Sequence, residues 1–575
     1  MVDYRVEIDD LNAHLYRVTL TLPQPAGLQE LSLATWAPGS YLVRDFVRHV
    51  TGLKAHQGGQ HREVTSIDKS RWSVACQGSR PLVVSMSVYA FDPSVRGAFL
   101  DGERGFFNGS SLFLRAEGRE HEPHRLRLGR LPRGWAVATS MRQGAEGAYE
   151  ADDHDELIDH PFELGRFWRG AFTVAGVPHE LVVSGALPGF DAERLLADTR
   201  RICETEVTFW HRRGKPPFER YLFLLQARDE GYGGLEHRDS TALVCARRDL
   251  PRQGAAGERS DGEVGLLGLI SHEYFHAWSV KRLRPAEHLR LDLQREQPSR
   301  MLWFFEGFTA YYDDLLLCRA GLIDAARYLR LVARSVNTLR GTPGRLVQSV
   351  AQASFDAWTR SYRADENTPN ATVSYYAKGA LVGLLCDLAV RERGPHSLDD
   401  VMRRLWQRHR DGGLDEAGVE AALSDAAGGP MTEPLHAWVH GIGELPLQAA
   451  LEAAGVSWTE EPLPLAGRLG LRLSEAALSG VQVRHVLRGG AAERAGIAAG
   501  DELLAIDGWR IRRLDDARAW WSPAQPCEML LVRDGRVRRV TLQAGGPAPP
   551  TTVSLALAAA PTADALALRR AWLGV

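Results

Sequence analysis

Two histidines four residues apart are the chemically most informative feature of this sequence. His272, Glu273 and His276 form the pattern His-Glu-x-x-His within the stretch Ser271–Trp278. On a helix, residues four apart project from one face, so the two imidazoles can hold a single zinc ion. The glutamate beside the first histidine then points at the position on the metal that the protein leaves open. This pattern predicts a zinc hydrolase.

A third protein ligand is needed, because a catalytic zinc ion takes three and keeps one position for water. The best choice is Glu306, 30 positions after His276. It lies in the apolar and aromatic stretch Leu302–Asp314, where a buried carboxylate needs a partner. A glutamate satisfied by an arginine or by backbone groups is the alternative. With one zinc ion per chain, Glu273 could take a proton from water and pass it to a leaving amine, which predicts amide hydrolysis.

The elements that must position these residues follow from periodicity. Ser260 and Glu263 match a capping box, so the motif helix is expected to open there and to run through both histidines. An amphipathic helix is expected from Ala192, and a strand at Tyr221–Gln226. Further helices are expected at about 304–320, 374–393, 398–410 and 415–440.

The N-terminal part has the pattern of β-strands. Polar and apolar residues alternate in Tyr4–Ile8, His14–Leu22 and Leu82–Tyr89, and the pattern continues at His179–Ser184. Clusters of Pro, Gly and Asp separate these runs. A β-rich N-terminal domain is therefore expected.

The chain is too long for one hydrophobic core, at 575 residues. The predicted fold class is multidomain α+β, with an N-terminal β domain at 1–175 and a catalytic domain at 176–455. Pro462 and Pro464 mark a linker to a small β-module at 463–545. The Ala- and Pro-rich tail, 546–575, is expected to be loosely packed.

Composition narrows the class of protein. The net charge of −3 creates no field that favours nucleic acid or an anionic membrane. No run of 18 apolar residues and no secretory signal is recognised, so no membrane partner is expected. The six cysteines are scattered, which is typical of reduced thiols in a cytoplasmic protein. The oligomeric state cannot be derived from these features.

Two stretches resemble a known family. His272–Pro285 and Trp303–Tyr312 look like the glycyl aminopeptidase family, gluzincin relatives of aminopeptidase N and leukotriene A4 hydrolase. Trp36–Asp45 and Asp155–Asp159 resemble the β-domain of that family. The resemblance implies a thermolysin-like catalytic domain whose C-terminal part is mainly helical. It also implies a zinc aminopeptidase that acts on peptides with a free N-terminus and favours small residues such as Gly or Ala.

The segment from Gly233 to His237 resembles the Gly-x-Met-Glu-Asn element of the aminopeptidases. By this resemblance Glu236 holds the α-amine of the substrate, and Gly233 and Gly234 let its backbone approach closely. Leu235 and His237 replace Met and Asn, so the match to aminopeptidase N is imperfect. Without the family, this glycine-rich segment is simply a turn.

A tyrosine is the expected oxyanion donor. Ser374–Ala380 resembles the Tyr-Glu-Lys-Gly-Ala stretch of those enzymes, in which Tyr376 would donate a hydrogen bond to the tetrahedral oxyanion. Tyr375 is the competing residue. Lys378 and Lys281 are two of only five lysines among 69 basic residues, which hints that arginine is unacceptable at both positions. Their roles stay open.

The C-terminal module resembles a PDZ domain in Gly480–Val486 and Gly490–Gly508, with Arg468–Leu471 as the expected carboxylate loop. Such domains bind peptide C-termini by β-augmentation. A purely structural module is the alternative.

Three other functions are alternatives to the zinc aminopeptidase. A zinc endopeptidase would have no use for Glu236, and epoxide hydrolysis has no support in the sequence. A PDZ-centred peptide-binding scaffold with an inactive peptidase core is the alternative from another class. The complete set of expected zinc ligands, together with Glu273, argues against it.

Overall fold

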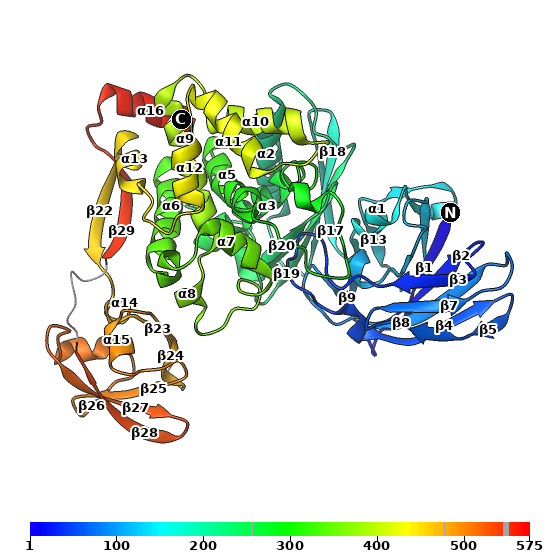
Figure 1. Cartoon of the computed structure of the whole chain (residues 1–575), viewed down its shortest axis with the longest axis horizontal. Coiled ribbons are helices and arrows are strands. Elements are labelled where there is room, and N and C mark those ends of the chain that lie inside the picture. Colours follow the sequence, from blue (N-terminus) through cyan, green and yellow to red (C-terminus); the bar gives the residue numbers. More distant parts are fainter. Residues whose placement is uncertain (255–256, 477, 544–550, 575) are drawn as a thin grey trace. The chain divides into compact units, whose positions relative to one another are not determined.

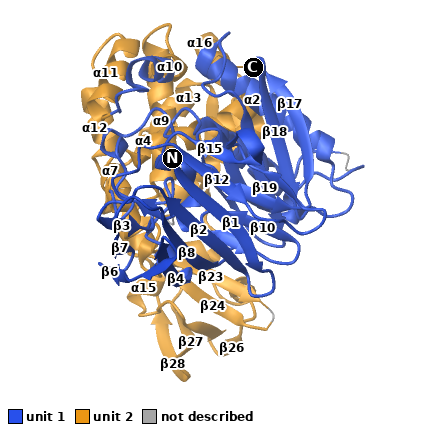
Figure 2. Ribbon diagram, turned by 90° about the vertical axis from the view of Figure 1, so that its right-hand side faces the viewer, with its two compact units in different colours: residues 1–297, 320–322, 402–414 blue, residues 298–319, 323–401, 415–575 orange. Residues whose placement is uncertain are grey.

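The computed structural model describes residues 1–254, 257–476, 478–543 and 551–574 (Figure 1). The chain divides into two compact units, which Figure 2 distinguishes by colour. Unit 1 comprises residues 1–297, 320–322 and 402–414, and unit 2 comprises residues 298–319, 323–401 and 415–575.

The N-terminal part of unit 1 consists of β-sheets, as the alternating pattern predicted. β1 and β8 include the predicted strands, and their alternate side chains are buried. One sheet has the order β14-β15-β12-β1-β2-β8-β4-β5, and two smaller sheets have the orders β13-β16-β10-β9 and β11-β3-β7-β6. The bounds are β1 Val2–Asp10, β2 Leu15–Leu22, β3 Leu28–Ser32, β4 Val50–Gln57, β5 Gln60–Arg62, β6 Val64–Ser66, β7 Arg71–Ala75, β8 Leu82–Tyr89, β9 Ala98–Leu100, β10 Arg104–Phe107, β11 Arg115–Ala116, β12 His124–Leu128, β13 Ala136–Ala138, β14 Arg142–Gln143, β15 Tyr149–Ala151 and β16 Phe162–Gly165, with the short helix α1 at His154–Ile158.

Another sheet of unit 1, formed by β17 to β21, supports the motif helix. Its order is β17-β18-β19-β21-β20, and among the described strands β20 lies at one edge. β18, β19 and β21 run parallel, whereas β20 is antiparallel to β21. The helix α3 packs against β20, β21 and α2. The bounds are β17 Trp168–Val174, β18 Val177–Ser184, α2 Ala192–His211, β19 Tyr221–Arg228, β20 Gly233–Glu236, β21 Ser240–Ala246 and α3 Asp261–Phe275, so the helix predicted from Ala192 and the strand predicted at Tyr221–Gln226 are confirmed.

Unit 2 begins with helices, and two of the expected ones are interrupted. The helix expected at 304–320 starts earlier and breaks at Glu306 into α4 and α5. The single helix expected at 415–440 is wrong, because Gly428 adopts a left-handed φ of 65° and Pro430 follows, which ends α11 before α12. The bounds are α4 Leu302–Phe305, α5 Gly307–Arg319, α6 Ala325–Arg340, α7 Val350–Phe355, α8 Thr368–Ala371, α9 Tyr375–Arg393, α10 Leu398–His409 (residues 402–409 of which belong to unit 1), α11 Glu416–Ala427, α12 Thr432–Val439 and α13 Leu447–Ala453.

The C-terminal segment is packed, not loose. β29 (Thr551–Leu557) pairs with β22 (Val456–Pro462), so Pro462, which was expected to mark a linker, ends a strand. The final helix, α16 (Ala563–Leu573), buries Trp572 completely, and the Trp572 indole donates a hydrogen bond to Tyr311 Oη at 3.0 Å. Expecting a loosely packed tail was therefore wrong for residues 551–574. The predicted boundary at 545/546 and Val575 lie outside the described residues.

The small β-module has its own apolar core. Its sheet has the order β23-β24-β25-β27-β28, with β26 paired to β25, and leaves β23 at one edge among the described strands. Residues from all parts of the module, including Leu469, Val483 and Leu531, are buried in this core. The bounds are α14 Leu465–Leu469, β23 Leu471–Ala476, β24 Gly480–Val486, α15 Ala491–Arg494, β25 Glu502–Ile506, β26 Trp509–Arg510, β27 Cys527–Arg533 and β28 Arg536–Leu542.

Among the described residues, no helix combines the length and apolar character that a bilayer crossing requires.

Candidate metal centre and substrate-binding site

The motif helix α3 is anchored at both ends. The Ser260 side chain accepts a hydrogen bond from Glu263 N at 3.1 Å, which caps the first turn as predicted. Near the other end, Ser271 Oγ donates to Glu206 Oε1 at 2.9 Å, and the Tyr274 hydroxyl lies 2.8 Å from His179 Nε2. The helix ends at Phe275, so His276 is its C-cap and not an internal residue.

The two motif histidines have the geometry of a chelating pair. Their Nε2 atoms lie 3.1 Å apart, and their rings are nearly perpendicular at 88°. His276 Nδ1 lies 2.8 Å from the carbonyl oxygen of Ser279, so this nitrogen carries the proton and Nε2 is left as an acceptor. Two nitrogens bound to one tetrahedral zinc ion at the usual bond length lie about 3.3 Å apart. The pair therefore fits a single zinc ion.

Glu306 lies at the break between α4 and α5 and is buried, with 2% of its surface exposed. The next residue, Gly307, sits where α5 passes α9, and a side chain there would collide with the backbone of Gly379. These two glycines allow the close approach of the helices that carry Glu306 and Tyr375. Among the described residues, donor atoms of His272, His276 and Glu306 all lie within 4.8 Å of one another. Two imidazoles and a carboxylate are an open donor set for zinc.

Glu273 lies directly beneath the edge strand. Its side chain is buried, at 5% exposed, and a side chain at position 234 would collide with its carboxylate. Gly234 is thus required so that β20 can pass over Glu273. Gly233 has a φ of 151°, a conformation that residues with a side chain rarely adopt. The structure therefore requires glycine at both positions, at 234 because of the close contact with Glu273 and at 233 because of the backbone conformation.

Glu236 projects from the same face of β20 as position 234, because side chains two apart on a strand share a face. It is 5% exposed, and among the described residues it has no hydrogen-bond or ion-pair partner. Gly39, in the loop after β3, packs against its carboxylate so closely that a side chain at position 39 would collide with it. A buried, unpaired carboxylate is costly unless a cation joins it, so this geometry can accommodate a cation.

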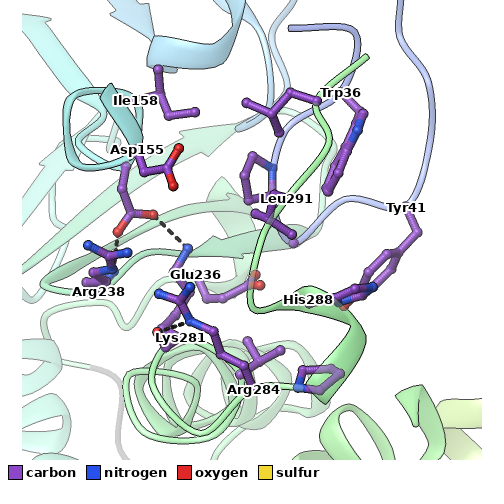
Figure 3. A pocket seen from close by; sticks show the side chains of 16 residues that line it. Trp36, Tyr41, Asp155, Ile158, Glu236, Arg238, Lys281, Arg284, His288 and Leu291 are labelled. Carbon is purple, nitrogen blue, oxygen red and sulfur yellow. Dashed lines mark hydrogen bonds and ion pairs between the residues drawn. The ribbon is translucent and has the colours of Figure 1, made fainter. Parts of the chain in front are cut away.

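The Glu236 side chain lines a cavity of about 70 Å³ within unit 1 (Figure 3). Trp36, Tyr41 and Leu291 form part of its apolar wall, and the Tyr41 ring stacks on His288 with centroids 6.3 Å apart. Its polar wall includes Arg284. No local sequence pattern indicates this cavity, because its walls come from four separate stretches of the chain.

A buried ion pair explains Lys281. Its Nζ atom lies 2.6 Å from Asp159 Oδ1, and both residues are 8% exposed. The same carboxylate accepts a hydrogen bond from Arg238 N at 2.9 Å and lies 3.3 Å from His237 Nδ1. Burial alone would raise the pKa of Asp159, but Lys281 and His237 outweigh it and hold that pKa well below its usual value. The rarity of lysine marks Lys281 in the sequence but does not indicate its partner. Asp159 stands out in the sequence only as part of the stretch Asp155–Asp159, for which no role was predicted.

The two tyrosines at the start of α9 differ in burial. Tyr375 is 1% exposed and belongs to the core, and burial raises its pKa. Tyr376 is partly exposed, with its ring stacked on that of Tyr375 at 4.7 Å. Lys378 is buried and donates to the carbonyl oxygen of Gly441 at 3.0 Å, and burial lowers its pKa to about 8. Lys378 therefore links α9 to the segment after α12, which is a structural role.

Three family models match the chain. They are described as the peptidase M61 N-terminal domain over residues 3–166, M61 glycyl aminopeptidase over residues 265–382, and PDZ domain over residues 459–520. Among proteins with curated functions, none matches.

Solved structures also match. A protein of the aminopeptidase N family from Idiomarina loihiensis is 35% identical, with a TM-score of 0.93 and coverage of 100% of both chains. An M1 zinc metallopeptidase from Deinococcus radiodurans is 16% identical, with a TM-score of 0.46 over 78% of this chain and 94% of its own. Yeast leukotriene A4 hydrolase is 13% identical, with a TM-score of 0.47 over 79% of this chain and 70% of its own.

The full-length match to a relative of this similarity agrees with the family models for the N-terminal and catalytic parts. The predicted architecture of a β-rich N-terminal domain, a helical catalytic part and a PDZ module is confirmed. The chain therefore belongs to the M61 glycyl aminopeptidase family of zinc metallopeptidases.

Proposed function

We propose that this protein is an aminopeptidase that holds one zinc ion per chain through His272, His276 and Glu306 and removes small N-terminal residues such as Gly or Ala from peptides. The observation that carries the proposal is Glu236, which is buried and unpaired on the strand that passes over Glu273. An endopeptidase, which binds no free α-amine, gives no reason for such a carboxylate.

The protein residues have separate tasks in this proposal. When bound, zinc would polarise the scissile carbonyl and acidify water. Glu273 accepts a proton from the attacking water and transfers it to the leaving amine. Tyr376 donates a hydrogen bond to the oxyanion, a role that its partial exposure supports over that of the buried Tyr375.

Glu236 fixes where the substrate is cut. It lies two residues along β20 from Gly234, the residue that packs on Glu273, and two residues of a strand span about 6.6 Å. A substrate whose ammonium pairs with Glu236 would therefore place its first peptide bond, and no later one, near Glu273. The cavity of about 70 Å³ beside Glu236 holds about five water molecules, which supports a preference for small side chains.

Glu236→Gln should lower kcat/KM for a glycine p-nitroanilide about 10- to 100-fold, because the ammonium loses a charged hydrogen bond. Acetylglycine p-nitroanilide should be a poor substrate of both enzymes. Glu230→Gln is the matched control, since Glu230 is exposed and forms an ion pair with Arg248 on the surface. If wild type and Glu236→Gln cleave the acetylated and free reporters equally well, the protein is an endopeptidase and the proposal fails.

The remaining assignments are also proposals. The PDZ module would bind peptide C-termini along β23, which the edge position of that strand supports. The division into segments 1–175, 176–455, 463–545 and 546–575, and the cytoplasmic location expected from the cysteine pattern, stay predictions.

A further inference from the structure

The cavity beside Glu236 contains charged groups that the proposed reaction does not use. Its lining includes three carboxylates, those of Asp155, Asp159 and Glu236. It also includes three cationic side chains, Arg238, Lys281 and Arg284. A site for glycine or alanine needs only the carboxylate that holds the ammonium. Binding of these two residues therefore does not account for the other charged side chains.

Most of these charged side chains form no ion pair among the described residues. Asp159 and Lys281 neutralise each other at 2.6 Å. The Arg284 guanidinium makes one hydrogen bond among the described residues, from Nε to the carbonyl oxygen of Lys281 at 3.1 Å, and no ion pair. The guanidinium of Arg238 has neither a hydrogen bond nor an ion pair among the described residues, since its backbone makes the contact with Asp159. Two guanidinium groups and two carboxylates are thus left to face the cavity.

A bound substrate changes this balance. Once an α-ammonium pairs with Glu236, the charges of the lining that still lack a partner are one anion, Asp155, and two cations, Arg238 and Arg284. The remaining charge is positive by one, which complements one carboxylate on the substrate. Arg284 is the better placed partner, because its Nε is fixed on Lys281 and its terminal nitrogens stay available for a two-pronged contact. Burial, together with the nearby Arg238, also lowers the pKa of Arg284, although the carboxylates of Asp159 and Asp155 act in the opposite direction.

The size of the cavity sets an upper limit on this substrate group. About 70 Å³ is room for about five water molecules, close to the five or so non-hydrogen atoms of an ammonium and a short acidic side chain. Figure 3 shows Glu236 and Arg284 in the wall of the same cavity, with Trp36 and Tyr41 on the loop from the N-terminal sheets.

We propose that this cavity receives the side chain of the substrate's N-terminal residue and that Arg284 pairs with the carboxylate of an acidic one, aspartate above all. This inference rests on the proposed aminopeptidase function and extends its substrate class from Gly and Ala to small acidic residues. Arg284 is a specificity-determining residue in this account, and Glu236 binds the amine of every substrate.

The test compares p-nitroanilides of aspartate, asparagine and glycine on the zinc-loaded full-length protein. Asparagine has the shape of aspartate without its charge, so the ratio of their kcat/KM values isolates the carboxylate. This ratio should be about 10 to 100 in the wild type, the range expected for a charged hydrogen bond. In Arg284→Gln it should fall to about 1, while kcat/KM for the glycine reporter stays within about 3-fold of wild type. Arg290→Gln is the control, because Arg290 is exposed on the same segment and does not line the cavity.

Inhibition by free amino acids gives a second measurement that does not depend on turnover of an acidic reporter. L-Aspartate should inhibit cleavage of the glycine reporter more strongly than L-asparagine in wild type, and equally in Arg284→Gln. Equal kcat/KM values for aspartate and asparagine in wild type, or an unchanged ratio in Arg284→Gln, would overturn the inference while leaving the aminopeptidase proposal intact. Failure to cleave the glycine reporter would instead overturn the proposed function and the inference with it.

Discussion

Replacing Glu273 by glutamine is expected to lower kcat for a glycine p-nitroanilide about 10²- to 10⁴-fold, the usual contribution of a positioned general base. Glutamine keeps the size of the side chain beneath Gly234 but cannot accept the proton of the attacking water. KM should change little, because Glu236 and not Glu273 binds the ammonium.

Metal content separates this effect from loss of the site. Glu273→Gln should retain the same zinc content as the wild type, since Glu273 is beside a ligand and not one of them. Glu287→Gln, an exposed glutamate changed in the same way, should have wild-type kcat. Near wild-type activity of Glu273→Gln would mean that another group takes the proton.

The second large effect is expected on stability. Lys281→Met should lower the free energy of unfolding by about 3–5 kcal/mol, because it leaves the buried Asp159 carboxylate without its cation. Lys69→Met is a matched control, since Lys69 and Asp45 also lie 2.6 Å apart but are 56% and 45% exposed. It should cost at most about 1 kcal/mol. Urea unfolding followed by circular dichroism measures both.

The cost of Lys281→Met should depend on pH in a defined direction. The pKa of Asp159 in the folded protein lies below its ordinary value of 3.8, so the native state binds fewer protons than the unfolded state near that pH. The stabilisation is therefore fully present above about pH 4 and is lost as the pH falls further. The difference between wild type and Lys281→Met should shrink below about pH 4. The variant Asp159→Asn/Lys281→Met should be more stable than Lys281→Met at pH 7. A constant difference from pH 7 to pH 3 would contradict this assignment.

Local patterns predicted the motif helix well because its signals are local. Ser260 caps α3 as expected, and the helix carries His272 and Glu273. The predicted helix included His276, whereas the helix ends at Phe275. The hydrogen bond from His276 to the Ser279 carbonyl depends on the path of the following loop, which the helical periodicity does not indicate. Helix ends are set by such contacts and not by periodicity.

Interrupted helices were harder to predict. The break at Glu306 lies beside the close crossing of α5 and α9 at Gly307 and Gly379, which are far apart in the sequence. By contrast, the break at Gly428 had a visible cause in the Gly-Gly-Pro sequence that starts there, and a stricter reading of helix stop signals would have found it.

The buried charges show what a single sequence leaves out. The rarity of lysine marked Lys281 as special, but nothing local connects it to Asp159, which lies 122 residues away. The cavity beside Glu236 likewise draws on the loop at Trp36, the helix α1 region and the segment after His276. Such sites arise from contacts between residues far apart in the sequence. The sequence can therefore indicate that a single residue is unusual, but not which residues it contacts.

The central claim is that His272, His276 and Glu306 together hold one catalytic zinc ion, and metal analysis of the purified protein tests it most directly. We expect about one equivalent of zinc per chain in the wild type, loss of aminopeptidase activity on chelation, and recovery when zinc is restored. Glu306→Ala should bind zinc much more weakly and lose activity with it. A wild-type protein that cleaves the glycine reporter with no bound metal, or a Glu306→Ala variant with full zinc content and full activity, would contradict the account.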